Sequence, residues 1–267
     1  RLSPAISQDW LALLPEQYQK PQAMTALLAV NHATRRFSGL VAVNDVSFEL
    51  HQAEILGMIG PNGAGKTTLV SLISGTLPLS AGDIAFEGRS ISTLQAFRRA
   101  RLGIGRTFQI MHPFPGLSVL DNVAVGALFG RGEDRLTLGE ARERARVQLD
   151  FVGLGEYAAQ RADELSGPGR KRLELAKALA MRPKVLLCDE VMAGLNAVEI
   201  DEVIGVIQRV RERGIGVLII EHVIKAIKTL SDRIFVLNHG EKIADGTPEA
   251  VLSDSRVIEA YLGRSRA

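Results

Sequence analysis

The sequence predicts an α/β fold with a parallel core sheet, an antiparallel β subdomain and a small helical subdomain. Short apolar runs alternate with helical patterns over most of the chain, and this alternation favours parallel strands joined by helices. The first two apolar runs follow each other without a helix between them, and one stretch in the middle is entirely helical in pattern. With 267 residues, of which 46% are hydrophobic and 23% charged, the chain can bury a large core.

The antiparallel β subdomain is predicted by two runs rich in β-branched residues, at 27–37 and 40–50, with a Ser-Gly step between them. Two such runs separated by a short turn form a hairpin. The next run, at 54–60, is continuous and apolar, as in a strand that is buried on both faces. A further strand is expected at 83–88.

The core sheet continues in the second half of the chain. Its expected strands are the apolar runs at 184–189, 216–221 and 233–244. The helical patterns that accompany the core strands cover 66–74, 170–180 and 197–212. Because strands and helices alternate here, we expect parallel pairing with crossover helices.

The helical subdomain is expected at about 113–180, where the chain is rich in Arg, Glu, Leu and Ala. Ser118, followed three residues later by Asp121, resembles a capping box. A last helix is predicted after Thr247, with Thr as the N-cap and Pro248 in the first helical position.

Charge and cysteine content exclude several classes of function. The 32 Lys and Arg residues nearly balance the 30 Asp and Glu residues, so no strong positive field attracts nucleic acid. We expect the basic cluster of Arg98, Arg99 and Arg101 to be a solvated helix face. The single cysteine, Cys188, cannot form an internal disulfide and is expected to be a buried apolar residue in a reducing compartment. No apolar run reaches the length of about 18 residues that a membrane span requires.

Residues 1–23 differ from the rest of the chain, with three prolines and the only Trp. They lack the long apolar stretch and the cleavage site of a signal peptide. Two interpretations stay open: an extension without a function of its own, or a linker from the tail of an upstream domain. Residues 24–267 are expected to form the functional domain.

A glycine-rich loop after the strand at 54–60 satisfies the pattern G-x-x-x-x-G-K-[ST]. Its residues are Gly60, Pro61, Asn62, Gly63, Ala64, Gly65, Lys66, Thr67 and Thr68. In such a loop, backbone N–H groups converge on phosphate oxygens at the positive end of the following helix. Lys66 can reach the β- and γ-phosphates, and the Thr67 hydroxyl can ligate Mg²⁺. The sequence therefore predicts a P-loop NTPase (RecA-like) core that binds a nucleoside triphosphate.

Two carboxylates form a second candidate site at the end of the strand at 184–189. Asp189 is placed to hold Mg²⁺, and Glu190 is placed to polarise a water molecule toward the γ-phosphate. A solvated strand end is the alternative interpretation of the same pair.

Together these motifs resemble the ATP-binding subunits of ABC transporters, over about residues 27–263. Five further features carry the resemblance: an aromatic residue before the loop, a glutamine after a strand, the start of the family's signature motif, a loop after the carboxylates and a histidine after a strand. In that order they are Phe37, Gln109, Leu165-Ser166-Gly167, Ala193-Gly194-Leu195-Asn196 and His222. The short interval from Lys66 to Asp189 argues against the related DNA-repair ATPases, which carry a long coiled coil there.

The resemblance implies an ATPase that uses ATP and Mg²⁺. Phe37 would stack on the adenine, and Gln109 would sense the Mg²⁺ that Thr67 and Asp189 hold. Glu190 would orient the attacking water molecule, and His222 would contact the γ-phosphate, as in other P-loop hydrolases.

The resemblance also implies partners. Two cassettes, identical or not, would pair head to tail, so that Ser166, Gly167 and Gly169 of one chain close on the ATP that the other chain holds. A transmembrane permease would dock in a groove near His112, Phe114 and Leu117, and a solute-binding protein would deliver the solute. The chain is expected at the cytoplasmic face of the inner membrane, peripheral or fused to a permease, without nucleic acid.

The finer resemblance is to the cassettes of hydrophobic, branched-chain amino-acid importers, with closely similar cassettes serving other small solutes. Two positions depart from the family pattern: Pro168 and Gly169 stand where the signature usually continues Gly-Gln, and Val191 replaces the usual Pro after the catalytic Glu. Since Pro168 has no N–H to offer a phosphate, the alternative is a regulatory subunit that hydrolyses ATP weakly.

Overall fold

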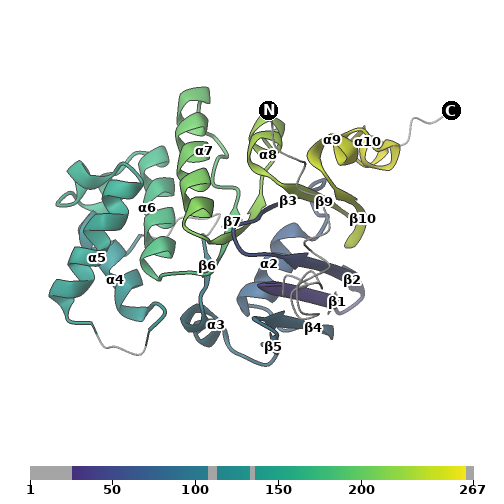
Figure 1. Ribbon diagram of the computed structural model, residues 1–267, viewed down its shortest axis with the longest axis horizontal. Helices are drawn as coiled ribbons and strands as arrows, with labels where there is room; N and C mark the ends of the chain where they lie inside the picture. The colour runs from purple at the N-terminus through teal and green to yellow at the C-terminus, as the bar shows by residue number, and fades with distance from the viewer. Residues whose placement is uncertain (1–25, 108–112, 133–135, 263–267) are drawn as a thin grey trace, which may run out of the picture.

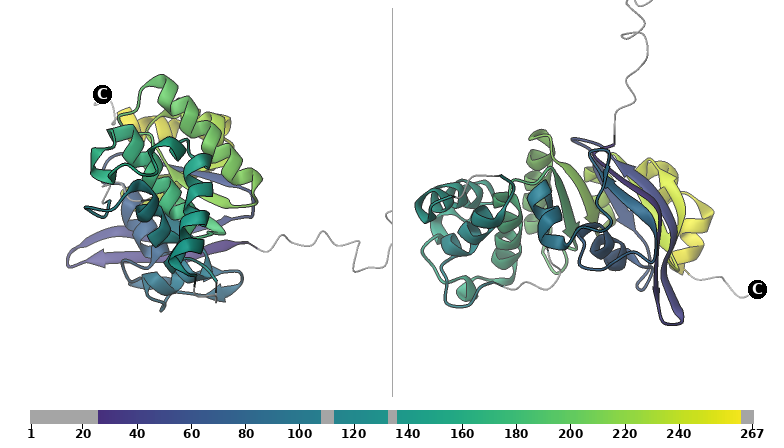
Figure 2. Two further views of the ribbon diagram at one scale, coloured as in Figure 1. Left: turned by 90° about the vertical axis from the view of Figure 1, so that its left-hand side faces the viewer. Right: turned by 90° about the horizontal axis from the view of Figure 1, so that it is seen from below.

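The computed structural model describes residues 26–107, 113–132 and 136–262 (Figure 1). The extension or linker predicted at 1–23 lies outside the described residues. Figure 1 and Figure 2 show a group of helices at one end, and the antiparallel sheet together with the last helices of the chain toward the other end. The group consists of α4 (Val119–Phe129), α5 (Leu138–Phe151) and α6 (Gly167–Ala180).

The antiparallel sheet has the strand order β2-β1-β4-β5. Its strands are β1 (Leu28–Phe37), β2 (Leu40–Leu50), β4 (Ala81–Phe86) and β5 (Arg89–Ser90). Leu28 pairs with Leu50, and Phe37 pairs with Leu40, so the predicted hairpin is confirmed.

The core sheet has the strand order β10-β9-β3-β8-β7-β6. Its strands are β3 (Ile55–Ile59), β6 (Ile104–Arg106), β7 (Val185–Asp189), β8 (Gly216–Ile220), β9 (Arg233–Asn238) and β10 (Glu241–Gly246). Strands β3, β9, β8, β7 and β6 pair in parallel, which confirms the parallel pairing predicted from the alternation of strands and helices.

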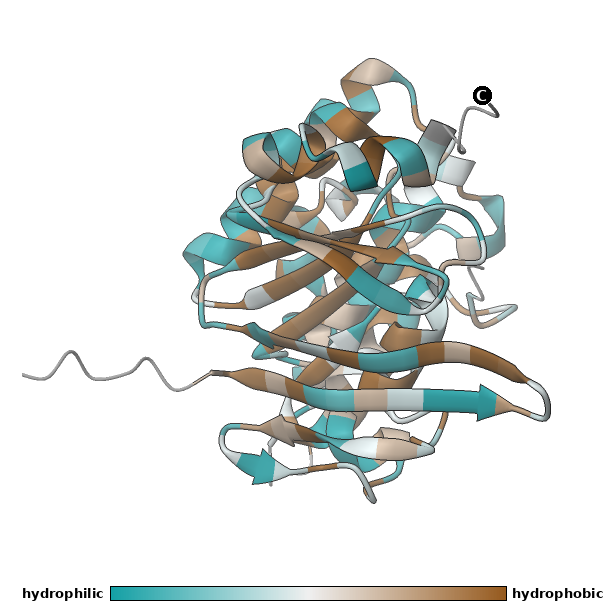
Figure 3. Ribbon diagram, turned by 90° about the vertical axis from the view of Figure 1, so that its right-hand side faces the viewer, coloured by the Kyte–Doolittle hydropathy of each residue, from teal (hydrophilic) through white to brown (hydrophobic). Residues whose placement is uncertain are grey.

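Strands β3, β7, β8 and β9 each contribute buried side chains to two hydrophobic clusters, because successive side chains point to opposite faces of a sheet. Leu186 and Cys188 pack with the helices, whereas Val185 and Leu187 pack with α2 and the antiparallel sheet. Figure 3 shows the core strands as largely hydrophobic and the antiparallel strands as mixed. Cys188 is fully buried, as predicted, and burial raises the pKa of its thiol.

The single strand expected at 233–244 is wrong. This segment is a hairpin, in which β10 returns antiparallel to β9. The turn forms at His239 and Gly240, whose φ angles are 48° and 83°. Two consecutive residues with positive φ reverse a chain tightly and join antiparallel strands.

The remaining helices surround the core sheet or close the chain. They are α2 (Lys66–Ser74), α3 (Ala96–Leu102), α7 (Ala197–Glu212), α8 (Ile224–Leu230), α9 (Pro248–Leu252) and α10 (Ser255–Leu262), with 3₁₀ turns at Gly155–Tyr157 and Ala162–Glu164. The predicted N-caps are confirmed: Ser118 accepts a hydrogen bond from the Asp121 N–H, and Thr247 accepts one from the Ala250 N–H. In the ranges that the structure describes, no helix combines the length and apolarity needed to cross a membrane.

Arg99 corrects the expectation of a solvated basic helix face. Arg98 and Arg101 are exposed, but Arg99 is only 2% exposed. Its guanidinium donates to the carbonyl oxygens of Leu72 and Ile73 at 2.7 and 3.0 Å. These carbonyls belong to the last turn of α2, where the usual intrahelical donors from the next turn are missing, and the Leu72 carbonyl also accepts the Gly75 N–H at 3.3 Å. Arg99 is therefore a structural cation that caps α2.

Candidate functional site

The glycine-rich loop lies between β3 and α2, wedged against two neighbouring strands. A Cβ atom on Gly60 would lie 2.1 Å from the Leu237 carbonyl oxygen of β9, and one on Gly65 would lie 2.3 Å from the Ala42 carbonyl oxygen of β2. Side chains at these positions would push the loop off the sheet. The glycines therefore fix the loop at the carboxyl end of β3, with its amides at the start of α2.

Lys66 is the first residue of α2 and is 6% exposed. Its Nζ donates to the carbonyl oxygens of Gly60 at 2.6 Å and Pro61 at 2.9 Å. Burial lowers the pKa of Lys66, while the carboxylates of Glu190 and Asp189 oppose that shift. The ammonium group thus lies among the loop atoms, on the side that faces the two carboxylates.

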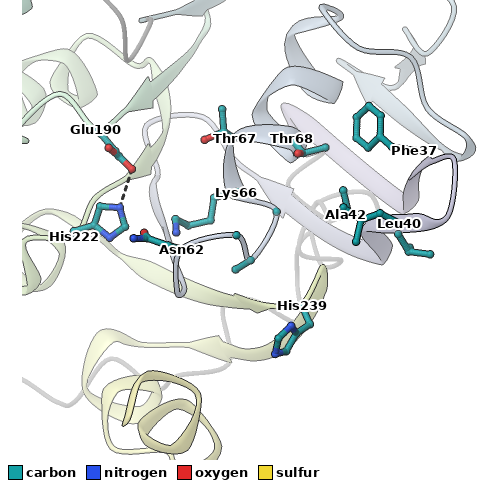
Figure 4. A pocket seen from close by; sticks show the side chains of 14 residues that line it. Phe37, Leu40, Ala42, Asn62, Lys66, Thr67, Thr68, Glu190, His222 and His239 are labelled. Carbon is teal, nitrogen blue, oxygen red and sulfur yellow. Dashed lines mark hydrogen bonds and ion pairs between the residues drawn. The ribbon is translucent and has the colours of Figure 1, made fainter. Parts of the chain in front are cut away.

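A cleft of about 950 Å³ opens over the loop. Figure 4 shows Glu190 and His222 on one side, Phe37 and Leu40 on the other, and loop side chains between them. The cleft is therefore polar around Lys66 and apolar at the hairpin of β1 and β2. This combination suits a nucleotide, with a base to stack and phosphates to bind.

Phe37 contributes an aromatic ring to the apolar side of the cleft. The side chain is 38% exposed, and the Arg35 guanidinium carbon lies 4.4 Å from the ring centroid. The cation holds the ring by a cation–π contact. Phe37 is thus a positioned surface aromatic and not a core residue.

Asp189 ends β7 with a carboxylate that is almost fully buried. Its Oδ2 lies 3.2 Å from the Arg106 guanidinium, while its buried Oδ1 accepts no hydrogen bond from the described residues. Burial raises the pKa of Asp189, and Arg106 opposes the rise. Mg²⁺ prefers oxygen ligands and is usually held by one or two carboxylates together with phosphates, so Asp189 and the Thr67 hydroxyl fit this ion. Over the described ranges, no cluster of three His, Cys, Asp or Glu side chains could bind a metal on its own.

Glu190 and His222 meet at the ends of neighbouring strands β7 and β8. The His222 Nε2 lies 2.7 Å from Oε1 of Glu190, a distance at which the ring N–H donates to the carboxylate. Both residues line the same cleft as Lys66. The structure therefore brings together the loop lysine, a carboxylate and a histidine that lie far apart in the sequence.

Comparison with known protein families shows to which family this chain belongs. The ABC transporter family model matches residues 43–193, more than half of the chain. The chain belongs to the ABC transporter family. The model of the branched-chain amino acid ATP-binding cassette transporters matches residues 241–267 of this cassette. The family resemblance predicted from the motifs is confirmed.

Individual relatives agree with this assignment. LivG of Salmonella typhimurium, a high-affinity branched-chain amino acid transport ATP-binding protein, is 38% identical over 251 residues, which cover 90% of this cassette and 98% of LivG. LptB of Escherichia coli, from a lipopolysaccharide export system, is 34% identical over 238 residues and covers 89% and 98% of the two chains. The ADP-bound cassette MJ1267 superposes with a TM-score of 0.82 at 29% identity and covers 90% of this cassette and 99% of MJ1267. The predicted fold class is thus confirmed.

The residues that resemble the family's signature motif lie at the start of α6. Ser166 is the N-cap, and its Oγ accepts a hydrogen bond from the Gly169 N–H at 3.2 Å. Pro168 is the second helical residue, because the helix already begins at Gly167. Ser166, Gly167 and Gly169 are absent from the described lining of the phosphate-loop cleft. A single chain therefore does not bring the signature to its own loop.

Two of the predicted site residues, Gln109 and His112, lie outside the described residues. Phe114 and Leu117 of the expected permease groove are exposed, and the Lys177 ammonium lies 5.2 Å from the Phe114 ring centroid.

Three residues near the site have no role in the sequence analysis. His239 lines the cleft beside the loop, and the mistaken long strand hid the turn that places it there. Lys171 and Glu221 both form hydrogen bonds with the backbone of residues 190–193. They lie on different elements, and no local pattern in the sequence connects them.

Proposed function

We propose that this cassette binds ATP in the cleft and hydrolyses it to drive a permease. The observation that supports hydrolysis most strongly is the 2.7 Å contact between Glu190 and His222 in the cleft that Lys66 also lines. The loop amides and Lys66 bind the β- and γ-phosphates, and Phe37 stacks on the adenine. Glu190 takes a proton from the attacking water molecule, while His222 holds its carboxylate in place.

Mg²⁺ is the metal that we propose for this site. Thr67, Asp189 and Gln109 would hold it, and this choice is supported by the buried Oδ1 of Asp189, which accepts no hydrogen bond from any described residue. When bound, the ion neutralises charge on the transferred phosphoryl group.

A second cassette completes the proposed site. The N-terminus of α6 presents Ser166, Gly167 and Gly169, of which Ser166 and Gly167 are exposed. In a head-to-tail dimer this helix end lies against the γ-phosphate that the partner chain holds, with a favourable dipole.

The proposed transport substrate is a branched-chain amino acid. The match at 241–267 and the 38% identity with LivG support this choice. The permease docks beside Phe114 and Leu117 at the cytoplasmic face of the membrane, and a solute-binding protein delivers the amino acid. Reconstitution with these partners tests the proposal: leucine should stimulate ATP hydrolysis, whereas stimulation by an unrelated solute alone would contradict it.

A weakly hydrolysing regulatory cassette is the second candidate function. Pro168 supports it, because this position has no N–H, and the neighbouring Gly169 N–H is already bonded to Ser166. Steady-state ATPase rates and ATP-dependent dimerisation, measured side by side, separate the two. Turnover with dimerisation supports the transport ATPase, and dimerisation with negligible turnover supports the regulatory cassette.

A further inference from the structure

The segment 190–193 that follows β7 carries Glu190 in a strained backbone. Glu190 has a φ of 54°, a region that costs a residue other than glycine of the order of 1–3 kcal/mol unless its surroundings hold it there. Val191 is 7% exposed and Met192 is fully buried. The position of the Glu190 carboxylate therefore depends on what holds this short segment.

Two charged side chains from other elements hold it from both sides. The Glu221 carboxylate, at the end of β8, accepts a hydrogen bond from the Met192 N–H at 2.7 Å. Lys171 of α6 donates to the carbonyl oxygens of Glu190, at 3.3 Å, and of Ala193. One side chain thus binds a backbone donor of the segment, and the other binds two backbone acceptors.

The two side chains also stabilise each other's charge. Glu221 is 1% exposed, and burial raises its pKa to about 7 while Lys171 opposes the rise. Burial lowers the pKa of Lys171, and Glu221 and Glu190 oppose that shift. Since a buried charge without a partner is costly, loss of either side chain also disturbs the other.

We propose that Glu221 and Lys171 are positioning residues that clamp segment 190–193 and so hold Glu190 against His222. Glu221 is suited to this task because it directly precedes His222 in the chain. The end of β8 therefore positions His222 directly, and it positions Glu190 through the bond from Glu221 to segment 190–193. It is not a second general base, because its carboxylate is buried, bonded to Met192 and absent from the described lining of the cleft. The inference rests on the proposed ATPase function.

The clamp also connects α6 to the reacting groups. Lys171 lies five residues after Ser166, the N-cap residue that is proposed to meet the partner's ATP. A displacement of the helix start would therefore reach the backbone of Glu190 through one side chain. Because misplacement of a catalytic group by about 1 Å can cost about 100-fold in rate, this connection gives α6 control over turnover.

The test compares four variants of the full chain. E221A removes the acceptor for the Met192 N–H, E221Q keeps an acceptor oxygen, and K171A removes the opposite side of the clamp. E54A is the matched control: Glu54 is also buried and accepts a backbone N–H, from His51 at 2.7 Å, but it is absent from the described lining of the cleft. The measurements are kcat, KM for ATP, melting temperature and hydrogen exchange of the Met192 amide.

We expect E221A and K171A to lower kcat by about 10- to 100-fold with little change in KM. E221Q should retain most of the rate, and E54A should lower only the melting temperature. The Met192 amide should exchange faster in E221A than in wild type or E221Q. Wild-type kcat in E221A, or a loss in E54A equal to that in E221A, would overturn the clamp. An inactive wild-type chain would instead overturn the proposed function, and the two failures are therefore distinguishable.

Discussion

The starts of α2 and α6 are the two helix N-termini that we propose bind phosphate, yet they are built differently. At α2, the N-cap Gly65 forms no side-chain capping bond, so no side chain of the cap competes with a ligand for the first amides of the helix. At α6, Ser166 already binds the Gly169 N–H, and Pro168 has no N–H. The comparison suggests different roles for the two helix starts: the loop of one chain binds the nucleotide by itself, whereas α6 of the second chain adds a weaker contact that controls hydrolysis.

The largest effect on ATP hydrolysis should come from a substitution in the phosphate loop. Lys66→Ala removes the ammonium group that is buried among the loop carbonyls, and a lost charged donor at a phosphate site costs roughly 100-fold or more in rate. We expect ATP binding and hydrolysis to be lost together. Lys225→Ala is the control, because that lysine is 67% exposed and pairs with Asp201. Full turnover in Lys66→Ala would show that the loop is not the phosphate site.

The next largest effect should come from a substitution at the start of α6. Pro168→Gly restores a backbone N–H, and a missing donor of this kind costs at most about 2.7–4 kcal/mol, or roughly 10²–10³ in rate. We expect a faster ATPase in the presence of the permease, with a melting temperature lower by no more than a few degrees. An unchanged rate would mean that the amide is not limiting, and the difference between the two helix starts would lose its functional meaning.

The burial of Glu221 should be visible in the pH dependence of the free energy of unfolding. The pKa of Glu221 rises from 4.5 to about 7 on folding, so the folded protein keeps the proton longer than the unfolded chain. Stability therefore falls as the pH rises from about 4.5 to about 7, by roughly 3 kcal/mol at about 1.36 kcal/mol per pKa unit. Denaturant unfolding of wild type and Glu221→Gln between pH 4 and 8 should show this difference. The two proteins share the groups that surround Glu221, namely Lys171, Glu190, Cys188 and the His222 backbone. If the free energies of unfolding of the two proteins ran parallel over this pH range, the raised pKa of Glu221 would be contradicted.

The smallest effect concerns the apolar side of the cleft. Phe37→Ala should weaken nucleotide binding by roughly 1–3 kcal/mol, the scale of base–aromatic stacking. ATP and GTP should be affected alike, because stacking does not read base edges. Phe97→Ala is the matched control, since Phe97 is an exposed ring with Arg98 5.8 Å from its centroid. Unchanged affinity in Phe37→Ala would remove the ring from the site.

These regions also differ in how far the sequence predicts them. The phosphate loop is contiguous, and its strand and helix flank it directly, so the motif alone locates Lys66. The sequence prediction missed the hairpin turn at His239 because it placed the polar residues from Asn238 to Lys242, which separate two apolar runs, within one strand. Arg99 was misjudged because its burial depends on carbonyl oxygens of α2, more than 20 residues away in the chain. The contacts of Lys171 and Glu221 with segment 190–193 join three elements, and no periodicity records such a meeting.

We propose that Glu190 is the base for ATP hydrolysis in a site that a second chain completes. The most direct measurement is the ATPase rate of Glu190→Gln together with its oligomeric state with and without MgATP. The substitution keeps the shape of the side chain and removes the base. We expect hydrolysis to fall to a small fraction of the wild-type rate and ATP to hold the variant as a stable dimer. Wild-type hydrolysis by Glu190→Gln, or an ATP-bound variant that stays monomeric, would contradict the account.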